Sequence, residues 1–420
     1  GLRGAPRLWY LKAKETIEKA GFEELRTGRG AFVLRDRTGP EPKLVAILVL
    51  HVDDACHAGH GPVYEKACKY IFQNLTIGRH GQDDFTFLGR HVVQLDDCTI
   101  MLDQKEFWET VHPVPMKLER MRQSNSLLTP AELTHYRSLV GQLAWPARET
   151  MPQLAYAVSD LQQKTEGSTV KDLVHANRVL TTAKNWACRD NQCLIFRPIA
   201  ATGPAKVGLE WSRRRSEKQL GLAAVHDAGF MGQPNGGSQQ GYAILVSTTD
   251  LYDGPAQAHI IDWGSSKIHR KVKSTLAAEA ASCQRAYDRA IFARVMIYEI
   301  EHGLQGDWHE MCKQVPFSLG TDCKSLYDLC VKEGSIPEER RVALDLLDVR
   351  DGVERYGDRI RWVPTDHMLV DCLTKQMHPA LLLQFLATGV YSLKYDQVIA
   401  ETKRSQLKLR KAAREAAGEA

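Results

Sequence analysis

A run of seven apolar residues, from Leu44 to Leu50, is the clearest hydrophobic pattern in the chain. The run is rich in branched side chains and too short to cross a membrane, so it predicts a buried β-strand. His51-Val52-Asp53-Asp54 follows it directly. Because successive side chains of a strand point to opposite faces, at most one of the two carboxylates faces any given site. Two interpretations stay open for this pair: a seat for a hard cation such as Mg²⁺, or a simple hairpin turn.

Short strands and helices are predicted around this strand, and a helical region is predicted after them. Thr129-Pro130-Ala131-Glu132 has the features of a helix start, because Thr can cap the helix, Pro fits the first turn and Glu can reach back to the cap. Apolar spacing and turn residues place the other elements up to residue 187. They are helices at 8–26, 63–75, 151–164 and 170–187 and strands at 32–34, 85–93 and 99–102.

A basic stretch that contains Arg213, Arg214 and Arg215 leads into a separate predicted domain. Three strands come first, then a long helix, and then strands that alternate with helices. This order is typical of a mixed-sheet α/β domain, so the predicted fold class is α/β, in an α+β multi-domain chain. The expected elements are strands at 220–230, 242–247, 259–265, 315–320 and 359–363 and helices at 274–302, 324–332, 338–350 and 368–376.

Composition and charge narrow the classes of protein that fit. The 420 residues are 43% hydrophobic and 25% charged, which indicates two or three folded cores and excludes a disordered chain. No apolar run approaches the length of a membrane span, so no membrane segment is expected. The net charge of +4 is mild. The basic run from Lys403 to Arg414 fits either a solvated helix end or a contact to a polyanion.

The ten cysteines include no Cys-x-x-Cys pair, so they indicate isolated thiols in a reducing compartment. Cys56, His57 and His60 come nearest to a metal-ligand cluster, but no second pair of ligands follows at zinc spacing, and a zinc site is not expected. The first residues, from Gly1 to Arg7, include no Met and no signal-type apolar segment. They predict a fragment or a processed product.

Four acidic residues of the C-terminal region stand where unpaired charge is unusual. Asp227 lies within the first strand, Glu279 on the apolar face of the long helix or at its margin, Asp322 after an apolar strand, and Asp371 near the start of the last helix. Each alone fits a cap or a turn. Together they would crowd like charges at one sheet edge, so they must be protonated or bind cations. Two Mg²⁺ ions would relieve the repulsion and suit an in-line phosphoryl displacement.

Motifs along the chain resemble, in order, the C-terminal part of the Pol polyprotein of copia-type long-terminal-repeat retrotransposons. That part comprises the end of the reverse transcriptase followed by ribonuclease H. Each motif is weak, but their order and spacing together are highly specific. The residues that carry the resemblance are Gly1 to Tyr10, His51-Val52-Asp53-Asp54, Phe87-Leu88-Gly89, Tyr136 to Gly141, Tyr156-Ala157-Val158, Asp227, Ala278-Glu279, Asp322, Val363 to Asp366 and Val370 to Lys375.

The resemblance implies a ribonuclease H that cleaves the RNA strand of an RNA–DNA hybrid, in a protein that works inside the cell, in a cytoplasmic particle or the nucleus. By this resemblance, two Mg²⁺ or Mn²⁺ ions are bound by Asp227, Glu279, Asp322 and Asp371. The implied domains are a truncated reverse-transcriptase palm, a helical thumb or connection, a ribonuclease H-like domain and a basic tail. Their expected extents are 1–104, 105–206, 207–385 and 386–420.

For the polymerase, the resemblance implies that Asp53 and Asp54 are metal ligands acting on an RNA template and a DNA primer. Arg213 to Arg215 are expected to contact phosphates, which adds affinity without sequence choice. The family's third polymerase Asp belongs to a segment upstream of Gly1, so polymerase activity is expected to need an upstream Pol segment.

Two further departures from the family's pattern are His51, where the family has Tyr, and Ala280, where an aromatic residue is usual. Two other interpretations of the whole chain stay open. The first is a catalytically inactive nucleic-acid-binding remnant of a decayed element. The second is an interaction module that keeps the ribonuclease-type fold without its chemistry.

Overall fold

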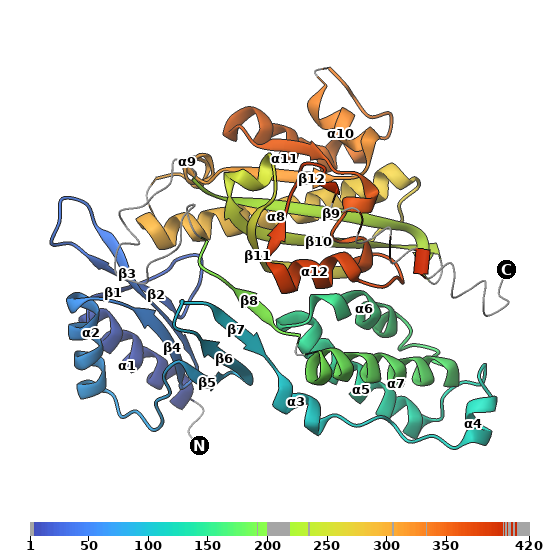
Figure 1. The fold of residues 1–420 in the computed structure, drawn as a ribbon, viewed down its shortest axis with the longest axis horizontal. Coiled ribbons are helices and arrows are strands. Elements are labelled where there is room, and N and C mark those ends of the chain that lie inside the picture. The colour runs from blue at the N-terminus through green and yellow to red at the C-terminus, as the bar shows by residue number, and fades with distance from the viewer. Residues whose placement is uncertain are drawn as a thin grey trace. The chain divides into compact units, whose positions relative to one another are not determined.

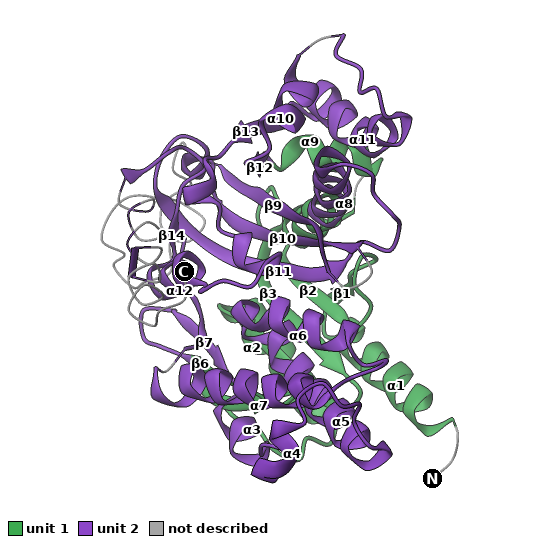
Figure 2. Ribbon diagram, turned by 90° about the vertical axis from the view of Figure 1, so that its right-hand side faces the viewer, with its two compact units in different colours: residues 1–93, 291–315 green, residues 94–290, 316–420 purple. Residues whose placement is uncertain are grey.

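The computed structural model describes most of the chain, in two compact units that Figure 2 shows in different colours. The first unit comprises residues 1–93 and 291–315, and the second comprises residues 94–290 and 316–420. Arg213 to Arg215 and most of the basic tail lie outside the described residues. The described residues are 4–190, 192–199, 219–233, 236–304, 306–332, 334–397, Ile399, Glu401, Ser405, Lys408 and Leu409.

A four-stranded antiparallel sheet forms the centre of the first unit. Its strands, in sheet order, are β1 (Phe22–Glu24), β2 (Ala31–Asp36), β3 (Lys43–His51) and β4 (Asp54–Gly59). Phe32 of β2 and Leu48 and Leu50 of β3 point into one core, which the helices α1 (Ala5–Lys19) and α2 (Pro62–Asn74) cover (Figure 1). The apolar strand predicted from the sequence is therefore present, and its buried side faces these helices.

Residues from later in the sequence complete the first unit. They are the C-terminal part of α8 (Thr275–His302) and α9 (Trp308–Gln314). The earlier hairpin of β5 (Asp84–Phe87) and β6 (Arg90–Gln94) belongs to the same unit up to Val93. Glu299 of α8 accepts hydrogen bonds from the main-chain N–H groups of Arg26 at 2.7 Å and Thr27 at 3.0 Å. The Arg35 guanidinium donates to the Glu299 carbonyl at 2.6 Å. These contacts fix the end of α8 to the strands of the first unit.

Helices form the first part of the second unit, around a core that contains Tyr136, Leu143 and Leu173. The capping box predicted at Thr129 is confirmed, because Thr129 and Glu132 bond each other's main-chain N–H groups at 3.3 and 2.8 Å. The elements are β7 (Ile100–Asp103), α3 (Lys105–Thr110), α4 (Leu118–Arg122), α5 (Pro130–Glu149), η1 (Pro152–Leu154), α6 (Ala155–Gln163), α7 (Val170–Lys184), η2 (Asn185–Arg189) and β8 (Leu194–Phe196), which pairs with β7.

A six-stranded mixed sheet forms the rest of the second unit, in the order β13-β12-β9-β10-β11-β14. The strands β9, β10, β11 and β14 pair antiparallel, whereas β12 and β13 join in parallel register. The predicted α/β multi-domain fold class is therefore confirmed. The strands are β9 (Leu220–Gln233), β10 (Gly237–Thr248), β11 (Ala256–Lys267), β12 (Phe317–Thr321), β13 (Arg359–Trp362) and β14 (Val390–Tyr391).

Helices cover both faces of the mixed sheet. α12 (Ala380–Thr388) lies on one face and α8 on the other, as Figures 1 and 2 both show. α10 (Lys324–Val331) and α11 (Arg340–Tyr356) follow β12, and the short turn η4 (Thr249–Tyr252) joins β10 to β11. No helix in the described part of the chain is long and apolar enough to cross a membrane.

The helix predicted at 368–376 was wrong. The segment follows one short 3-10 turn, η5 (Thr365–His367), and contains another, η6 (Asp371–Leu373), and the last helix, α12, begins only at Ala380. Its apolar residues, Met368, Leu369, Val370, Cys372 and Leu373, are all buried. A helix has one apolar face, whereas this segment is surrounded by the core on several sides, so tertiary packing decides its conformation.

Candidate active site

Asp227 lies in the middle of β9, a central strand of the mixed sheet. Side chains alternate along a strand, and Ala223, Val225 and then Asp227 point to the face that carries the α12 core. The Asp227 carboxylate accepts a hydrogen bond from the hydroxyl of Thr374. Only 4% of Asp227 is exposed. Burial, followed by the charge of Asp371, raises the pKa of its carboxyl to about 7.

Glu279 approaches the same part of β9 from α8. Its Oε1 atom accepts a hydrogen bond from the main-chain N–H of Ala228 at 3.2 Å. One turn later on α8, the Ser282 hydroxyl donates to the Asp227 carbonyl at 2.8 Å. These two contacts attach the helix to β9 next to Asp227. Burial, followed by the charge of Asp227, raises the pKa of the Glu279 carboxyl well above its ordinary value.

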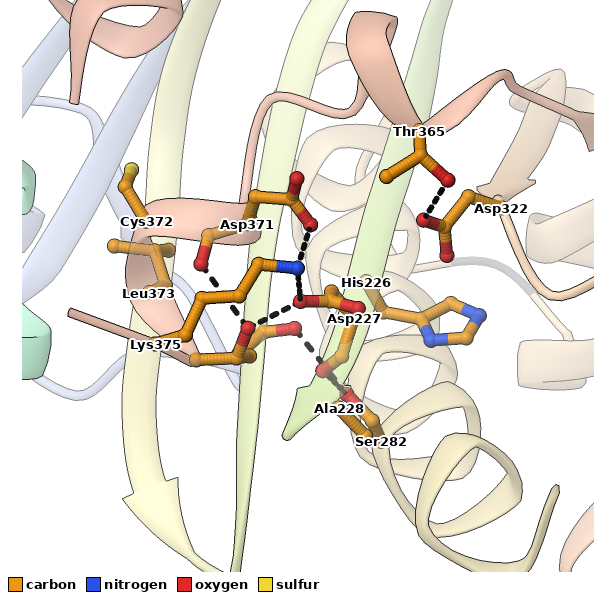
Figure 3. A network of polar contacts seen from close by, with 12 residues as sticks. His226, Asp227, Ala228, Ser282, Asp322, Thr365, Asp371, Cys372, Leu373 and Lys375 are labelled. Carbon is orange, nitrogen blue, oxygen red and sulfur yellow. Dashed lines mark hydrogen bonds and ion pairs between the residues drawn. The ribbon is translucent and has the colours of Figure 1, made fainter. Parts of the chain in front are cut away.

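Asp322 follows β12, which lies beside β9 in parallel register and pairs Thr321 with His226. Asp322 follows Thr321 and Asp227 follows His226, so the parallel register brings the two acids close together. Asp322 Oδ2 accepts a hydrogen bond from the Thr365 hydroxyl at 2.9 Å, which Figure 3 shows as a dashed line. The Thr365 contact fixes the orientation of the Asp322 carboxylate.

Carboxylate oxygens of Asp227, Glu279 and Asp322 all lie within 4.8 Å of one another. Three like charges at this separation cannot all be ionised without a counter-charge. Carboxylate oxygens are the ligands that Mg²⁺ and Mn²⁺ prefer. One oxygen of the set, Glu279 Oε2, is buried and accepts no hydrogen bond. The donor set and this unsatisfied oxygen both fit a divalent cation.

Asp371, the fourth predicted acid, lies on η6 beside this group and is bridged to it by a lysine. The Lys375 ammonium is 2.8 Å from Asp371 Oδ1 and 3.7 Å from Asp227 Oδ2. Figure 3 shows the lysine side chain reaching between the two carboxylates. Burial opposes the charge of Lys375, but Asp227 and Asp371 outweigh it and raise the pKa of the ammonium. A cation of the protein itself therefore neutralises this side of the site.

Two glycines let the η6 segment reach the sheet at Asp227. Gly241 pairs with Asp227 across β9 and β10. A Cβ atom on Gly241 would lie 2.8 Å from both Leu373 Cβ and Thr374 Cγ2. A Cβ atom on Gly229 would lie 2.7 Å from the Thr374 carbonyl oxygen. The absence of both side chains brings Thr374 and Lys375 to the Asp227 carboxylate.

Asp53 and Asp54 lie far along the chain from this site, in the tight turn between β3 and β4. His51 pairs with Asp54, and Val52 adopts a positive φ of 54° in the turn. Both carboxylates are exposed. Among the described residues, neither belongs to a group of three possible metal ligands. The hairpin turn is thus observed, and the metal-binding role of the pair stays a prediction, as does the phosphate contact of Arg213 to Arg215.

Sequence reasoning did not assign roles to four residues that shape the site. Thr365, Thr374 and Lys375 belong to two motifs that carried the family resemblance, so their order in the sequence was an available signal. His226 directly precedes Asp227 and is fully buried. Its only sequence signal is its position in an otherwise apolar strand, Leu222 to Val225.

No family model matches the chain. Among curated proteins, the chain is 24% identical over 394 residues to the retrovirus-related Pol polyprotein from transposon RE1 of Arabidopsis thaliana, and 24% identical over 389 residues to that from transposon RE2. Each alignment covers 90% of this chain, which spans 23% and 24% of the two relatives' lengths. A putative transposon Ty5-1 protein of Saccharomyces cerevisiae is 24% identical over 192 residues, which are 43% of this chain and 60% of that protein.

Solved structures also resemble parts of the chain. LC11-RNase H1 in complex with an RNA/DNA hybrid aligns with a TM-score of 0.24 and 14% identity, over 36% of this chain and 93% of that one. The foamy viral protease-reverse transcriptase dRH in complex with double-stranded DNA aligns with a TM-score of 0.40 and 12% identity, over 76% of this chain and 46% of that one. The sequence relatives confirm the resemblance to retrotransposon Pol polyproteins that the motifs predicted.

Proposed function

We propose that this chain, a relative of copia-type retrotransposon Pol polyproteins, is a ribonuclease H that cleaves the RNA strand of RNA–DNA hybrids. The observation that carries the proposal is the convergence of Asp227, Glu279 and Asp322. Their carboxylates come from β9, from α8 and from the residue after β12, and they meet where β12 ends beside β9. Placing three acids together, two of them buried, is costly unless a cation is bound there. Such an arrangement of charge serves metal-dependent phosphodiester hydrolysis better than it serves stability.

In this proposal, Asp227, Glu279 and Asp322 hold a divalent cation, Mg²⁺ or Mn²⁺, and Asp227 and Asp371 help to hold a second. When bound, the two ions supply an activated water and stabilise the leaving 3′ oxygen. Lys375 lies between the Asp227 and Asp371 carboxylates, so its side chain has to move away before the second ion can bind there. Lys375 is well placed to move, because about half of its side chain is exposed (48%).

The protein's own donors keep the carboxylates in place. Thr365 donates to Asp322, Thr374 donates to Asp227, and the Ala228 N–H donates to Glu279. Each of these donors comes from a strand of the sheet or from a turn that packs against it. Such donors reduce the reorganisation of the ligands during the reaction.

The reverse-transcriptase part is proposed on the resemblance alone. Asp53 and Asp54 would be polymerase metal ligands, and the substrates would be an RNA template and a DNA primer, together with an upstream Pol segment. The proposed extents are a palm at 1–104, a thumb or connection at 105–206, the ribonuclease H-like domain at 207–385 and a basic tail at 386–420.

Hybrid cleavage by the purified chain tests the proposal. RNA in an RNA–DNA hybrid should be cleaved with Mg²⁺ or Mn²⁺ present and should survive in EDTA. Asp322→Asn should lower the rate by orders of magnitude while hybrid binding persists, because a metal ligand is lost but phosphate contacts are not. Asp351→Asn is the matched control, because Asp351 lies on α11 in a surface ion pair with Arg355. Cleavage that is unaffected by EDTA would contradict the proposal.

The two rival interpretations differ in binding. An inactive nucleic-acid-binding remnant would bind hybrid in a salt-sensitive manner without cleaving it, and an interaction module would show neither property. If Arg213, Arg214 and Arg215 contact phosphates, replacing all three with Ala should lower the log–log salt slope by roughly 0.7–0.9 per lost contact. Replacing Lys12, Lys313 and Arg355, three exposed residues elsewhere, removes the same charge and should change the slope less. An equal slope for wild type and the arginine variant would make the run a solvated linker.

A further inference from the structure

His226 directly precedes Asp227 on β9 and points to the opposite face of the sheet. It pairs with Tyr242 of β10 on one side and with Thr321 of β12 on the other, so it lies in the interior of the sheet. None of its surface is exposed. Because alternate side chains of a strand point to opposite faces, Asp227 faces the η6 segment and His226 faces α8. Glu279 projects from that helix toward the same part of β9.

The imidazole of His226 and the carboxylate of Glu279 each contain a buried polar atom that has no hydrogen-bond partner. Neither ring nitrogen of His226 is hydrogen-bonded, and neither is Glu279 Oε2. His226 Nδ1 lies 3.7 Å from this same oxygen. An unpaired buried donor or acceptor is destabilising. Two such groups facing each other are complementary, because one can donate a proton and the other can accept it.

We propose that His226 is a positioning residue for Glu279, and that its Nδ1–H donates a hydrogen bond to Glu279 Oε2 and fixes the carboxylate for cation binding. This inference rests on the proposed metal-dependent function. Glu279 Oε1 is already held by the Ala228 N–H, so a second donor on Oε2 would fix both oxygens of the group. A shift of the Glu279 side chain by under about 1 Å would bring the pair within hydrogen-bond distance.

The geometry also indicates which tautomer of His226 the hydrogen bond needs. A neutral ring can donate from only one nitrogen. The nitrogen nearest to Glu279 is Nδ1, so the geometry selects the tautomer that has its proton there.

Three variants separate hydrogen bonding from space filling. His226→Asn keeps an amide donor near the position of Nδ1, His226→Gln moves the amide toward the position of Nε2, and His226→Leu removes the donor. Mn²⁺ binding to the full chain without nucleic acid is measured by electron paramagnetic resonance, and thermal unfolding checks the fold. His226→Leu and His226→Gln should weaken Mn²⁺ binding about tenfold, which is the effect expected from losing a group that orients a ligand. His226→Asn should stay within about threefold of wild type.

Each result has a defined meaning. Weak binding by the Leu and Gln variants together with near-normal binding by the Asn variant supports the positioning role. Equal Mn²⁺ binding by all variants, or equal weakening in all of them, overturns it and leaves His226 as a residue that fills space. If the Leu variant does not fold, Mn²⁺ binding by the Asn and Gln variants is compared. Weaker binding by the Gln variant than by the Asn variant supports the positioning role, and equal binding overturns it. Absence of Mn²⁺ binding in the wild-type chain contradicts the proposed function itself, which separates that failure from failure of the His226 inference.

Discussion

The Lys375 ammonium lies 2.8 Å from the Asp371 carboxylate, four residues earlier in the chain. An ordinary α-helix would produce the same spacing, but here the pair spans η6 and the residues after it. The same ammonium is 3.7 Å from Asp227 Oδ2. Lys375 thus offsets the charges of two acids at the place where a second divalent cation is proposed to bind.

Lys375→Met should have opposite effects on the metal-free protein and on metal binding. Without the ammonium, Asp227 and Asp371 repel each other, which should destabilise the metal-free protein by less than about 1 kcal/mol, because the lysine is half exposed and solvent screens its charge. The Mg²⁺ concentration for half-maximal hybrid cleavage should fall roughly three- to fivefold, because the ion no longer competes with the ammonium. Thermal unfolding and a Mg²⁺ titration of the cleavage rate measure the two effects.

The control for this prediction is Lys332→Met. Lys332 forms an exposed ion pair with Asp328 on α10, so the substitution removes a lysine charge that pairs with an acid outside the candidate active site. An unchanged Mg²⁺ midpoint in Lys375→Met would show that the lysine does not compete with a bound cation.

Gly241→Ala should disturb the site through packing. The new Cβ would lie 2.8 Å from Leu373 Cβ and Thr374 Cγ2, so the η6 segment must move away from the sheet and take Thr374 with it. Overpacking of this kind costs about 1–3 kcal/mol. Gly232→Ala on β9 is the matched control, because its Cβ would contact nothing within 4 Å. Chemical unfolding should show the loss for Gly241→Ala, and equal stability of the two variants would contradict the packing argument.

The acids of the site could be predicted because their signals are local. Asp227 interrupts an apolar strand, Glu279 lies on the apolar side of a long helix, and Asp322 follows a strand. Alternation in strands and the helical repeat are enough to place such residues at one sheet edge. The order of the motifs then supplied the chemistry.

The contacts that hold these acids could not be predicted, because they depend on packing between distant segments. The apolar spacing of 368–376 suggested a helix, but Gly229 and Gly241 admit the segment to the sheet as turns. Lys375 reaches Asp227 only in that conformation. Helix α12 was missed for a related reason: the predicted helix was placed before Pro379, and the real one begins just after it.

The stability of the metal-free protein should depend on pH through Asp227. The pKa of this carboxyl rises from 3.8 to about 7 in the folded protein. Between these values the folded protein keeps a proton that the unfolded chain has lost. Its stabilising effect is therefore complete below pH 3.8 and is lost as the pH rises through about 7. Glu279, whose pKa is raised by burial and then by Asp227, changes stability in the same direction.

Mg²⁺ should reverse this trend, because it binds the deprotonated carboxylates. Asp227 and Glu279 should make the melting temperature in EDTA lower at pH 8 than at pH 5. Adding Mg²⁺ should raise the melting temperature more at pH 8 than at pH 5. Asp227→Asn should flatten the EDTA profile and reduce the Mg²⁺ effect. A Mg²⁺-induced increase of the same size at both pH values would show that these carboxyls do not bind the ion.

Asp83 and Asp84 are the next pair of adjacent acids after the Asp53-Asp54 turn in the sequence, and their contacts do not suggest metal binding. Asp83 occupies a turn with a φ of 63°. Asp84 begins β5, and its Oδ1 atom is 2.7 Å from His91 Nε2. Neither belongs to a group of three possible metal ligands among the residues that the structure describes.

The 420-residue chain alone should therefore not extend a DNA primer on an RNA template, although it contains Asp53 and Asp54. Nucleotidyl transfer through two metal ions needs a further carboxylate that bridges both, and within the described residues none accompanies this exposed pair. Primer extension with Mg²⁺ and all four deoxynucleotides measures this, and hybrid cleavage in the same preparation shows that the protein is folded. Supplying an upstream palm segment that carries an Asp should restore extension, and Asp53→Asn should abolish it again. Extension by the chain alone that is lost in Asp53→Asn would show that the polymerase carboxylates lie elsewhere in this sequence.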